Sequence, residues 1–87
     1  MTIAPNPFSG ATFIKYQVAR PGPIKLSILD ATGRRVRTLA QGIHRPGIYG
    51  LTWDSRDDRF RQVPRGVYFV RLVSGGHTAS EKILLMR

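Results

Sequence analysis

Three carboxylates and three arginines crowd the stretch from Asp54 to Arg61, which is the only acidic cluster in the sequence. Asp54, Asp57 and Asp58 could supply oxygens to Ca²⁺, which takes six to eight oxygen ligands. The stretch has neither the Asp-x-Asp-x-Asp-Gly spacing nor the distal glutamate of a calcium loop, and the arginines compete for the same carboxylates. We therefore expect Asp–Arg pairing and turn capping here, with a calcium site as the weaker alternative.

Other side chains that could do chemistry lack partners at a useful spacing. His44 and His77 stand far apart in turn-rich stretches, without a third metal ligand nearby. None of the five serines lies in a Gly-x-Ser-x-Gly motif, and Glu81 is the only glutamate. The absence of cysteine excludes disulfides and thiolate metal sites. The sequence therefore predicts no enzyme, no catalytic residue and no cofactor.

The chain is strongly basic, with a formal net charge of +9 that is carried mostly by arginine. Such an excess raises affinity for polyanions, and arginine pairs bidentately with phosphate or carboxylate. Arg34, Arg35 and Arg37 form a compact basic stripe just after Gly33. No base-stacking aromatic accompanies the stripe, so we expect a solvated strand edge and no specific nucleic-acid partner.

Apolar and polar residues alternate with period two along most of the chain, which is typical of half-buried strands. Asp30–Gly33 reads as the turn of a hairpin. In Arg34–Ala40 the apolar positions are three apart, which predicts a β-bulge or a strong twist. We expect a loop over Gln41–Pro46. Six or seven short strands with frequent turn signals and no helical period predict a single antiparallel β-sandwich, with a small barrel as the competing architecture.

The phase of each strand predicts which side chains are buried. Phe13, Ile48 and Phe69 fall on the strand positions that alternate with the predicted core positions, so they are candidates for an exposed or interfacial patch. Phe60 and Val63 are expected to anchor the charged loop inward. The predicted core consists of Ile14, Tyr16, Val18, Leu26, Ile28, Tyr49, Leu51, Trp53 and Tyr68.

Five motifs occur in one order: Asn6-Pro-Phe8, Asp30-Ala-Thr-Gly-Arg34, Gly47-x-Tyr-x-Leu-x-Trp-Asp54, Gly66-Val-Tyr-Phe-Val-Arg-Leu72 and Lys82-Ile-Leu-Leu-Met-Arg87. Together they resemble the Ig-like domain of the flagellar hook-capping protein (FlgD) and the related C-terminal sorting domains of the type IX (Por) secretion system. One departure is clear, because these relatives commonly carry a glycine where Phe60 stands here.

The resemblance implies a seven-stranded Ig-like sandwich over residues 5–87, preceded by a leader or linker at 1–4. It implies a non-catalytic module at the C-terminus of a larger bacterial protein that is secreted or held at the cell surface. The implied partners are an outer-membrane secretion apparatus or sortase-like peptidase, and an anionic surface polysaccharide. The implied sorting residues are Val67, Tyr68, Phe69, Val70, Arg71, Leu72, Lys82, Ile83, Leu84, Leu85, Met86 and Arg87.

Two other functions stay open at this point. A structural module, such as a spacer, a filament subunit or a hook-cap-like subunit, could assemble through its edge strands. A polyanion-binding or carbohydrate-binding domain is the lesser alternative.

Overall fold

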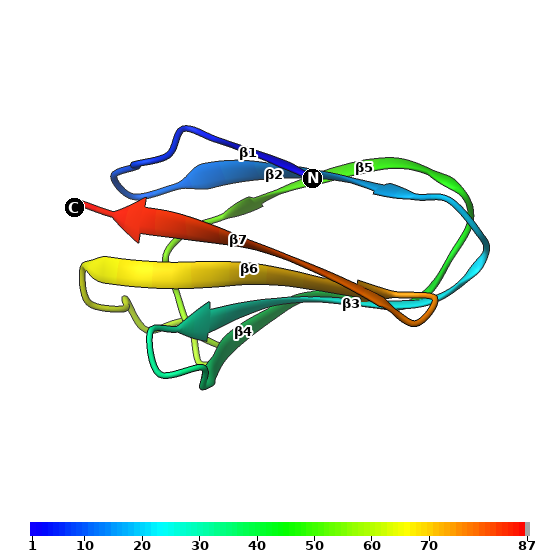
Figure 1. The fold of residues 1–87 in the computed structure, drawn as a ribbon. Helices are drawn as coiled ribbons and strands as arrows, with labels where there is room; N and C mark the ends of the chain where they lie inside the picture. Colours follow the sequence, from blue (N-terminus) through cyan, green and yellow to red (C-terminus); the bar gives the residue numbers. More distant parts are fainter. Residues whose placement is uncertain (87) are drawn as a thin grey trace.

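The computed structural model describes residues 1–86, in which seven strands and no helix form two facing sheets (Figure 1). This arrangement confirms the predicted Ig-like antiparallel sandwich. No helix in the described range is long and apolar enough to cross a membrane. The strands are β1 (Thr2–Ala4), β2 (Thr12–Val18), β3 (Gly22–Asp30), β4 (Arg35–His44), β5 (Gly47–Trp53), β6 (Gly66–Ser74) and β7 (His77–Leu85).

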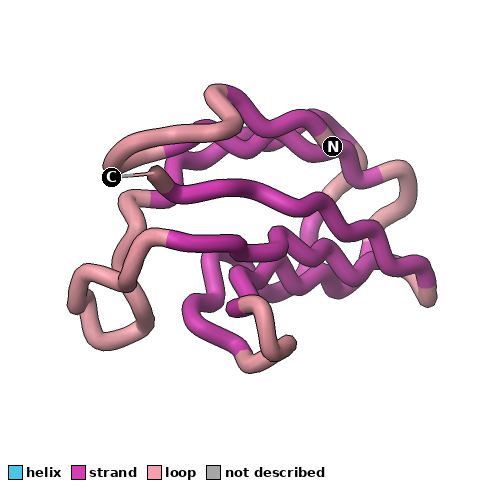
Figure 2. Tube along the Cα trace, turned by 60° about the vertical axis from the view of Figure 1, so that its left-hand side comes forward, coloured by secondary structure: helices cyan, strands magenta, loops and turns pink. Residues whose placement is uncertain are grey.

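The strands divide into a three-stranded sheet, β1-β2-β5, and a four-stranded sheet, β4-β3-β6-β7. All neighbouring strands within the two sheets run antiparallel. The chain stays in one sheet at the β3–β4 and β6–β7 hairpins and changes sheet between β2 and β3, β4 and β5, and β5 and β6. Loops gather at the two ends of the layers, where side chains from distant parts of the sequence can meet (Figure 2).

The core lies between the sheets and is centred on Trp53, which is fully buried. Its ring contacts those of Phe8 and Tyr68, with centroids 5.9 and 5.4 Å away, and its Nε1 donates a hydrogen bond to the carbonyl of Arg56. Most of the predicted core residues are buried: Ile14, Tyr16, Val18, Leu26, Ile28, Trp53 and Tyr68.

Tyr49 and Leu51 depart from the predicted core, because they are only partly buried. Both have the inward phase and pack against the core cluster. However, β5 is an edge strand of the three-stranded sheet, so no further strand covers their open side. The alternation along the strand therefore predicted correctly that both side chains point inward. The edge position of β5 determines how much of them stays exposed.

The β3–β4 pairing contains the irregularity that the apolar spacing predicted. Register shifts fall between Leu26 and Ser27 and between Ile28 and Leu29. The loop predicted over 41–46 is wrong for residues 41–44, which continue β4 and pair with the start of β3. Their largely polar sequence fits an exposed edge strand, which needs no apolar alternation. His44, at the end of β4, packs against Tyr49.

The first four residues were expected to form a leader, but the structure places a strand there. β1 pairs with β2, and Ile3 lies opposite Ile14. Met1 and Ile3 pack against the core cluster. Three residues are too few for a strand signal in the sequence, and the contacts that order β1 come from tertiary packing.

Candidate functional site

The predicted sorting residues of β6 and β7 divide between the two faces of the hairpin. Side chains on alternate positions point into the sandwich or away from it, as the period of a strand requires. Arg87 lies outside the described residues. The inward residues Tyr68, Val70, Leu72, Ile83 and Leu85 are buried in the core. The outward residues are Val67, Phe69, Arg71, Lys82, Leu84 and Met86.

Three of the outward residues, Val67, Phe69 and Leu84, form what we call the hairpin patch. Val67 lies opposite Leu84 in the β6–β7 register, and Phe69 lies opposite Lys82. Val67 and Leu84 are 36% and 37% exposed, so the outer face of this hairpin is open. β6 is a central strand, paired with β3 on one side and β7 on the other. Its outer face is nevertheless only partly covered, since Val67 is exposed and Phe69 is half-buried.

The segment Asn6–Phe8, which we call the N-terminal clamp, bonds to the outer edge of β7 (Figure 1). The side-chain amide of Asn6 donates to the carbonyl of Lys82 and accepts from the amide of Leu84, each at 3.0 Å. The amide of Phe8 donates to the carbonyl of Leu84 at 3.0 Å, and the amide of Met86 donates to the carbonyl of Phe8 at 2.8 Å. These backbone groups of the last strand are therefore already bonded within the domain.

Phe8 ties the clamp to the core as well as to the sheet edge. Its side chain is buried and contacts Trp53, and its backbone forms a parallel bridge with Leu85. The Asn6-Pro-Phe8 motif was visible in the sequence, but its contact with β7 was not. More than seventy residues separate Asn6 from Lys82 and Leu84, and local pattern carries no information over that separation. The aromatic anchor Phe8 in a proline-rich turn segment was the one available signal.

The acidic cluster and the basic stripe, which are separate in the sequence, bond to each other. Arg37 pairs with Asp54 at 3.4 Å. The amide of Asp58 donates to the carbonyl of Val36 at 3.1 Å, and its carboxylate accepts from the amide of Thr38 at 3.0 Å. The loop thus covers part of the β4 edge, which would otherwise present unpaired backbone groups.

The carboxylate of Asp57 shapes the turn of this loop. It accepts the backbone amides of Arg59 and Arg61 at 2.9 and 3.0 Å. These hydrogen bonds hold the pKa of Asp57 below its usual value, and the bond from the Arg61 amide has the largest effect. Asp54, Asp57 and Asp58 therefore serve different partners, and residues 1–86 contain no group of three acidic, His or Cys side chains able to hold a metal ion.

Phe60 does not anchor the loop inward, which corrects the prediction, whereas Val63 is buried. The amide of Phe60 closes a turn on the carbonyl of Asp57, and Phe60 has a φ of 62°. That left-handed conformation normally favours glycine, the residue that the resemblance led us to expect near this position. The ring is 66% exposed and lies 5.1 Å from the guanidinium carbon of Arg37.

The outer face of the three-stranded sheet carries the two remaining opposite-phase residues. Phe13 and Ile48 are 48% and 69% exposed, as their phase predicts. The ring of Phe13 lies across the backbone of Gly50, so close that a Cβ on Gly50 would overlap Phe13 Cζ. A side chain at this position would displace the ring.

Comparisons with known proteins agree with this architecture. A sequence model of the FlgD Ig-like domain matches residues 7–77. Among solved structures, PorZ, a surface component of the type IX secretion system of Porphyromonas gingivalis, matches with a TM-score of 0.68 and 22% identity over 99% of this chain and 11% of PorZ. FlgD from P. aeruginosa matches with a TM-score of 0.60 and 18% identity over 86% of this chain and 59% of FlgD.

This chain therefore spans only a small part of PorZ and less than two thirds of that FlgD chain. At these identities the two likenesses show a shared fold. No curated protein sequence matches the chain.

Proposed function

The chain belongs to the FlgD Ig-like domain family, and we propose that it is a non-catalytic C-terminal module of a larger exported bacterial protein, used for sorting or cell-surface attachment. The observation that carries the proposal is the hairpin patch, an apolar surface on the strands to which the resemblance assigns the sorting signal. Lys82 lies beside Phe69 and Arg71 lies two residues further along β6, so cations border the apolar side chains.

Recognition of this module takes place through the outer face of the terminal hairpin. Strand pairing at the edge of the last strand, supported by contacts to Arg and Lys side chains, is another way in which a partner could read this hairpin. Asn6 and Phe8 already bond the carbonyls of Lys82 and Leu84 and the amides of Leu84 and Met86. A partner that paired with this part of the edge would first have to displace the N-terminal clamp. Contact with the patch side chains needs no such displacement, so the proposed reader is a secretion apparatus or sortase-like peptidase with an apolar, acidic-rimmed surface.

A reporter fusion tests this proposal. Residues 1–87 are fused to the C-terminus of a periplasmic reporter in a bacterium with a type IX secretion system, and export is measured by fractionation. We expect export of the wild-type fusion and retention of Val67→Ser/Leu84→Ser. The matched control is Ile48→Ser, which changes an exposed apolar residue on the other sheet. Retention of the wild type, or equal export of both variants, would overturn the proposal.

An assembly module is the second candidate, and one observation favours it. Phe13 on β2 and Ile48 on the edge strand β5 expose apolar surface on the outer face of the three-stranded sheet. Such an edge is a template for pairing with a second copy of the chain. Light scattering over a range of concentrations tests this function. Oligomers that disappear in Ile48→Ser would support it, and a monomer at all concentrations would exclude it.

A further inference from the structure

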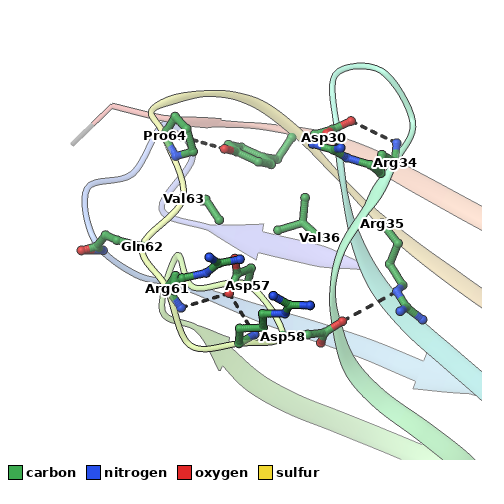
Figure 3. Close-up of a pocket in the computed structure, with 12 residues that line it drawn as sticks. Asp30, Arg34, Arg35, Val36, Asp57, Asp58, Arg61, Gln62, Val63 and Pro64 are labelled. Carbon is green, nitrogen blue, oxygen red and sulfur yellow. Dashed lines mark hydrogen bonds and ion pairs between the residues drawn. The ribbon is translucent and has the colours of Figure 1, made fainter.

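A groove of about 720 Å³ opens between the β3–β4 turn and the loop that joins β5 to β6 (Figure 3). Its middle is apolar, with Val36 and Val63 facing one another near Pro64, whose carbonyl accepts a hydrogen bond from the Tyr68 hydroxyl at 2.6 Å. The groove shares no residue with the hairpin patch, so a ligand in the groove would occupy a site that is distinct from the proposed sorting surface. Around the apolar middle stand four arginines and three aspartates: Arg34, Arg35, Arg59, Arg61, Asp30, Asp57 and Asp58.

Three of these arginines contact an aspartate through Nε. The Nε–carboxylate distances are 3.4 Å for Arg34 with Asp30, 3.7 Å for Arg35 with Asp58 and 3.6 Å for Arg61 with Asp57. An Nε contact orients the planar guanidinium and leaves its two terminal amino groups to donate elsewhere.

The aspartates are themselves fixed by the turns that they cap. Asp30 accepts hydrogen bonds from the amides of Thr32 and Arg34, and Asp57 accepts those of Arg59 and Arg61. Each carboxylate is thus satisfied by the protein before any ligand arrives. A cation would have to displace an arginine from it, whereas an anion can accept from guanidinium groups that contact the aspartates through Nε.

We propose that this groove binds an organic phosphate, with the phosphate on the guanidinium groups of Arg35, Arg59 and Arg61. The carbon skeleton of the ligand then lies on Val36 and Val63. A phosphate monoester offers three oxygens and a double charge, which several guanidinium groups can share, whereas a carboxylate offers only two oxygens. The apolar middle of the groove adds contact area that inorganic phosphate cannot use.

Nuclear magnetic resonance titration of the isotopically labelled domain tests the site with phenyl phosphate as the probe. At constant ionic strength, we expect saturable shifts of the Val36, Arg59 and Val63 amides. Phenyl phosphate should bind more tightly than either inorganic phosphate or phenylacetate. The variant Arg59→Gln/Arg61→Gln should weaken binding by at least about tenfold, since a charged hydrogen bond contributes about that factor or more.

The matched control is Arg71→Gln/Lys82→Gln, which removes two positive charges from the outer face of the hairpin, away from the groove. It should leave the affinity within about twofold, because exposed distant charges are largely screened. Shifts that do not saturate, or equal weakening by both double variants, would overturn the proposed site. Binding would then be a general effect of the net charge of the domain. Equal affinity for phenylacetate would overturn the assignment to phosphate, and equal affinity for inorganic phosphate would overturn the role of Val36 and Val63.

Discussion

The guanidinium of Arg37 lies against the ring of Phe60, although Phe60 holds a backbone conformation with a φ of 62° that disfavours any side chain. Arg37 also donates to the carbonyl of Arg56 at 3.2 Å, so it ties the loop to β4. An aromatic residue in the left-handed region costs about 1–2 kcal/mol. A cation–π contact at an exposed site contributes about 0.5–1 kcal/mol in return.

Comparison of Phe60→Gly with Phe60→Ala separates backbone strain from the ring contact. Both variants lose the contact with Arg37, but only glycine accepts the positive φ without strain. We expect Phe60→Gly to be more stable than Phe60→Ala by about 1 kcal/mol in urea unfolding. Equal stability would show that this loop relaxes to another conformation when the ring is removed.

Removal of the Asn6 side chain should loosen the end of the last strand. Asn6→Ala deletes the bonds to Lys82 and Leu84, which should cost about 1–2 kcal/mol. Amide hydrogen exchange should then speed up at Leu84. Asn6→Asp keeps the acceptor for Leu84 and loses the donor to Lys82, so its Leu84 amide should stay better protected. If the Leu84 amide of Asn6→Ala exchanges at the wild-type rate, the clamp does not hold the strand.

Trp53 should dominate the stability of the domain. Trp53→Ala removes a fully buried ring that contacts Phe8 and Tyr68, with an expected loss of about 3–5 kcal/mol. For a domain of this size, that is a large fraction of the free energy of unfolding. Ile48→Ala, at an exposed position, should change stability by less than about 1 kcal/mol. Thermal and urea unfolding measure both, and similar effects would contradict the assigned core.

Gly50 and Phe13 should show coupled energetics. Gly50→Ala forces the Phe13 ring to move, because the new Cβ overlaps Cζ, and we expect a loss of about 1 kcal/mol. In a Phe13→Ala background the same change should be neutral or stabilising, since alanine loses less backbone entropy than glycine. A double-mutant cycle measures this coupling. Additive effects of the two changes would show that the position of the Phe13 ring does not depend on the absence of a side chain at Gly50.

Acid should destabilise the domain through its turn aspartates. The pKa of Asp30 is lowered mainly by the hydrogen bond from the Thr32 hydroxyl and next by that from the Arg34 amide. The pKa of Asp57 is lowered mainly by the hydrogen bond from the Arg61 amide. A lowered pKa gives stability that is complete above the unfolded-state value of about 3.9 and is lost as pH falls through the folded-state value. We therefore expect the melting temperature of the domain to decrease when the pH is lowered beyond about 4.

Amide variants test the source of that acid sensitivity. Asp30→Asn and Asp57→Asn should melt at lower temperature than wild type at neutral pH, and the difference should shrink as the pH falls. Glu81→Gln matches their change in charge at an exposed position of β7 and should retain the wild-type profile. An unchanged acid profile in both Asp variants would assign the sensitivity to other groups.

The sequence predicted the fold where local pattern carries the information, and it failed where contacts are distant. Alternation placed Ile14 and Val18 in the core correctly, because a strand with one covered face reveals its phase. The same alternation could not show that Leu51 lies on an edge strand, since strand order is not encoded within one strand. The inward prediction for Phe60 failed because hydrophobicity alone was used, and backbone conformation at that turn overrides it.

The candidate site was predicted in part for the same reason. The residues of the terminal hairpin were identified, and their division into core and outer face follows from period two. The bonds from Asn6 and Phe8 to β7 join the two ends of the chain, and a single sequence contains no signal of that pairing. The groove likewise joins Arg35 of β4 to Asp58 of the loop between β5 and β6, a contact that exists only after folding.

The parallel bridge between Phe8 and Leu85 has a consequence for how the domain should bear mechanical load. Once β1 has separated from β2, a force that pulls the two chain ends apart draws these parallel segments in opposite directions along their shared axis. The hydrogen bonds that join Asn6–Phe8 to Lys82–Met86 are then sheared together, whereas peeling would break them one after another. In a protein tethered at a cell surface, this geometry would make the module resist extension until those bonds rupture as one unit.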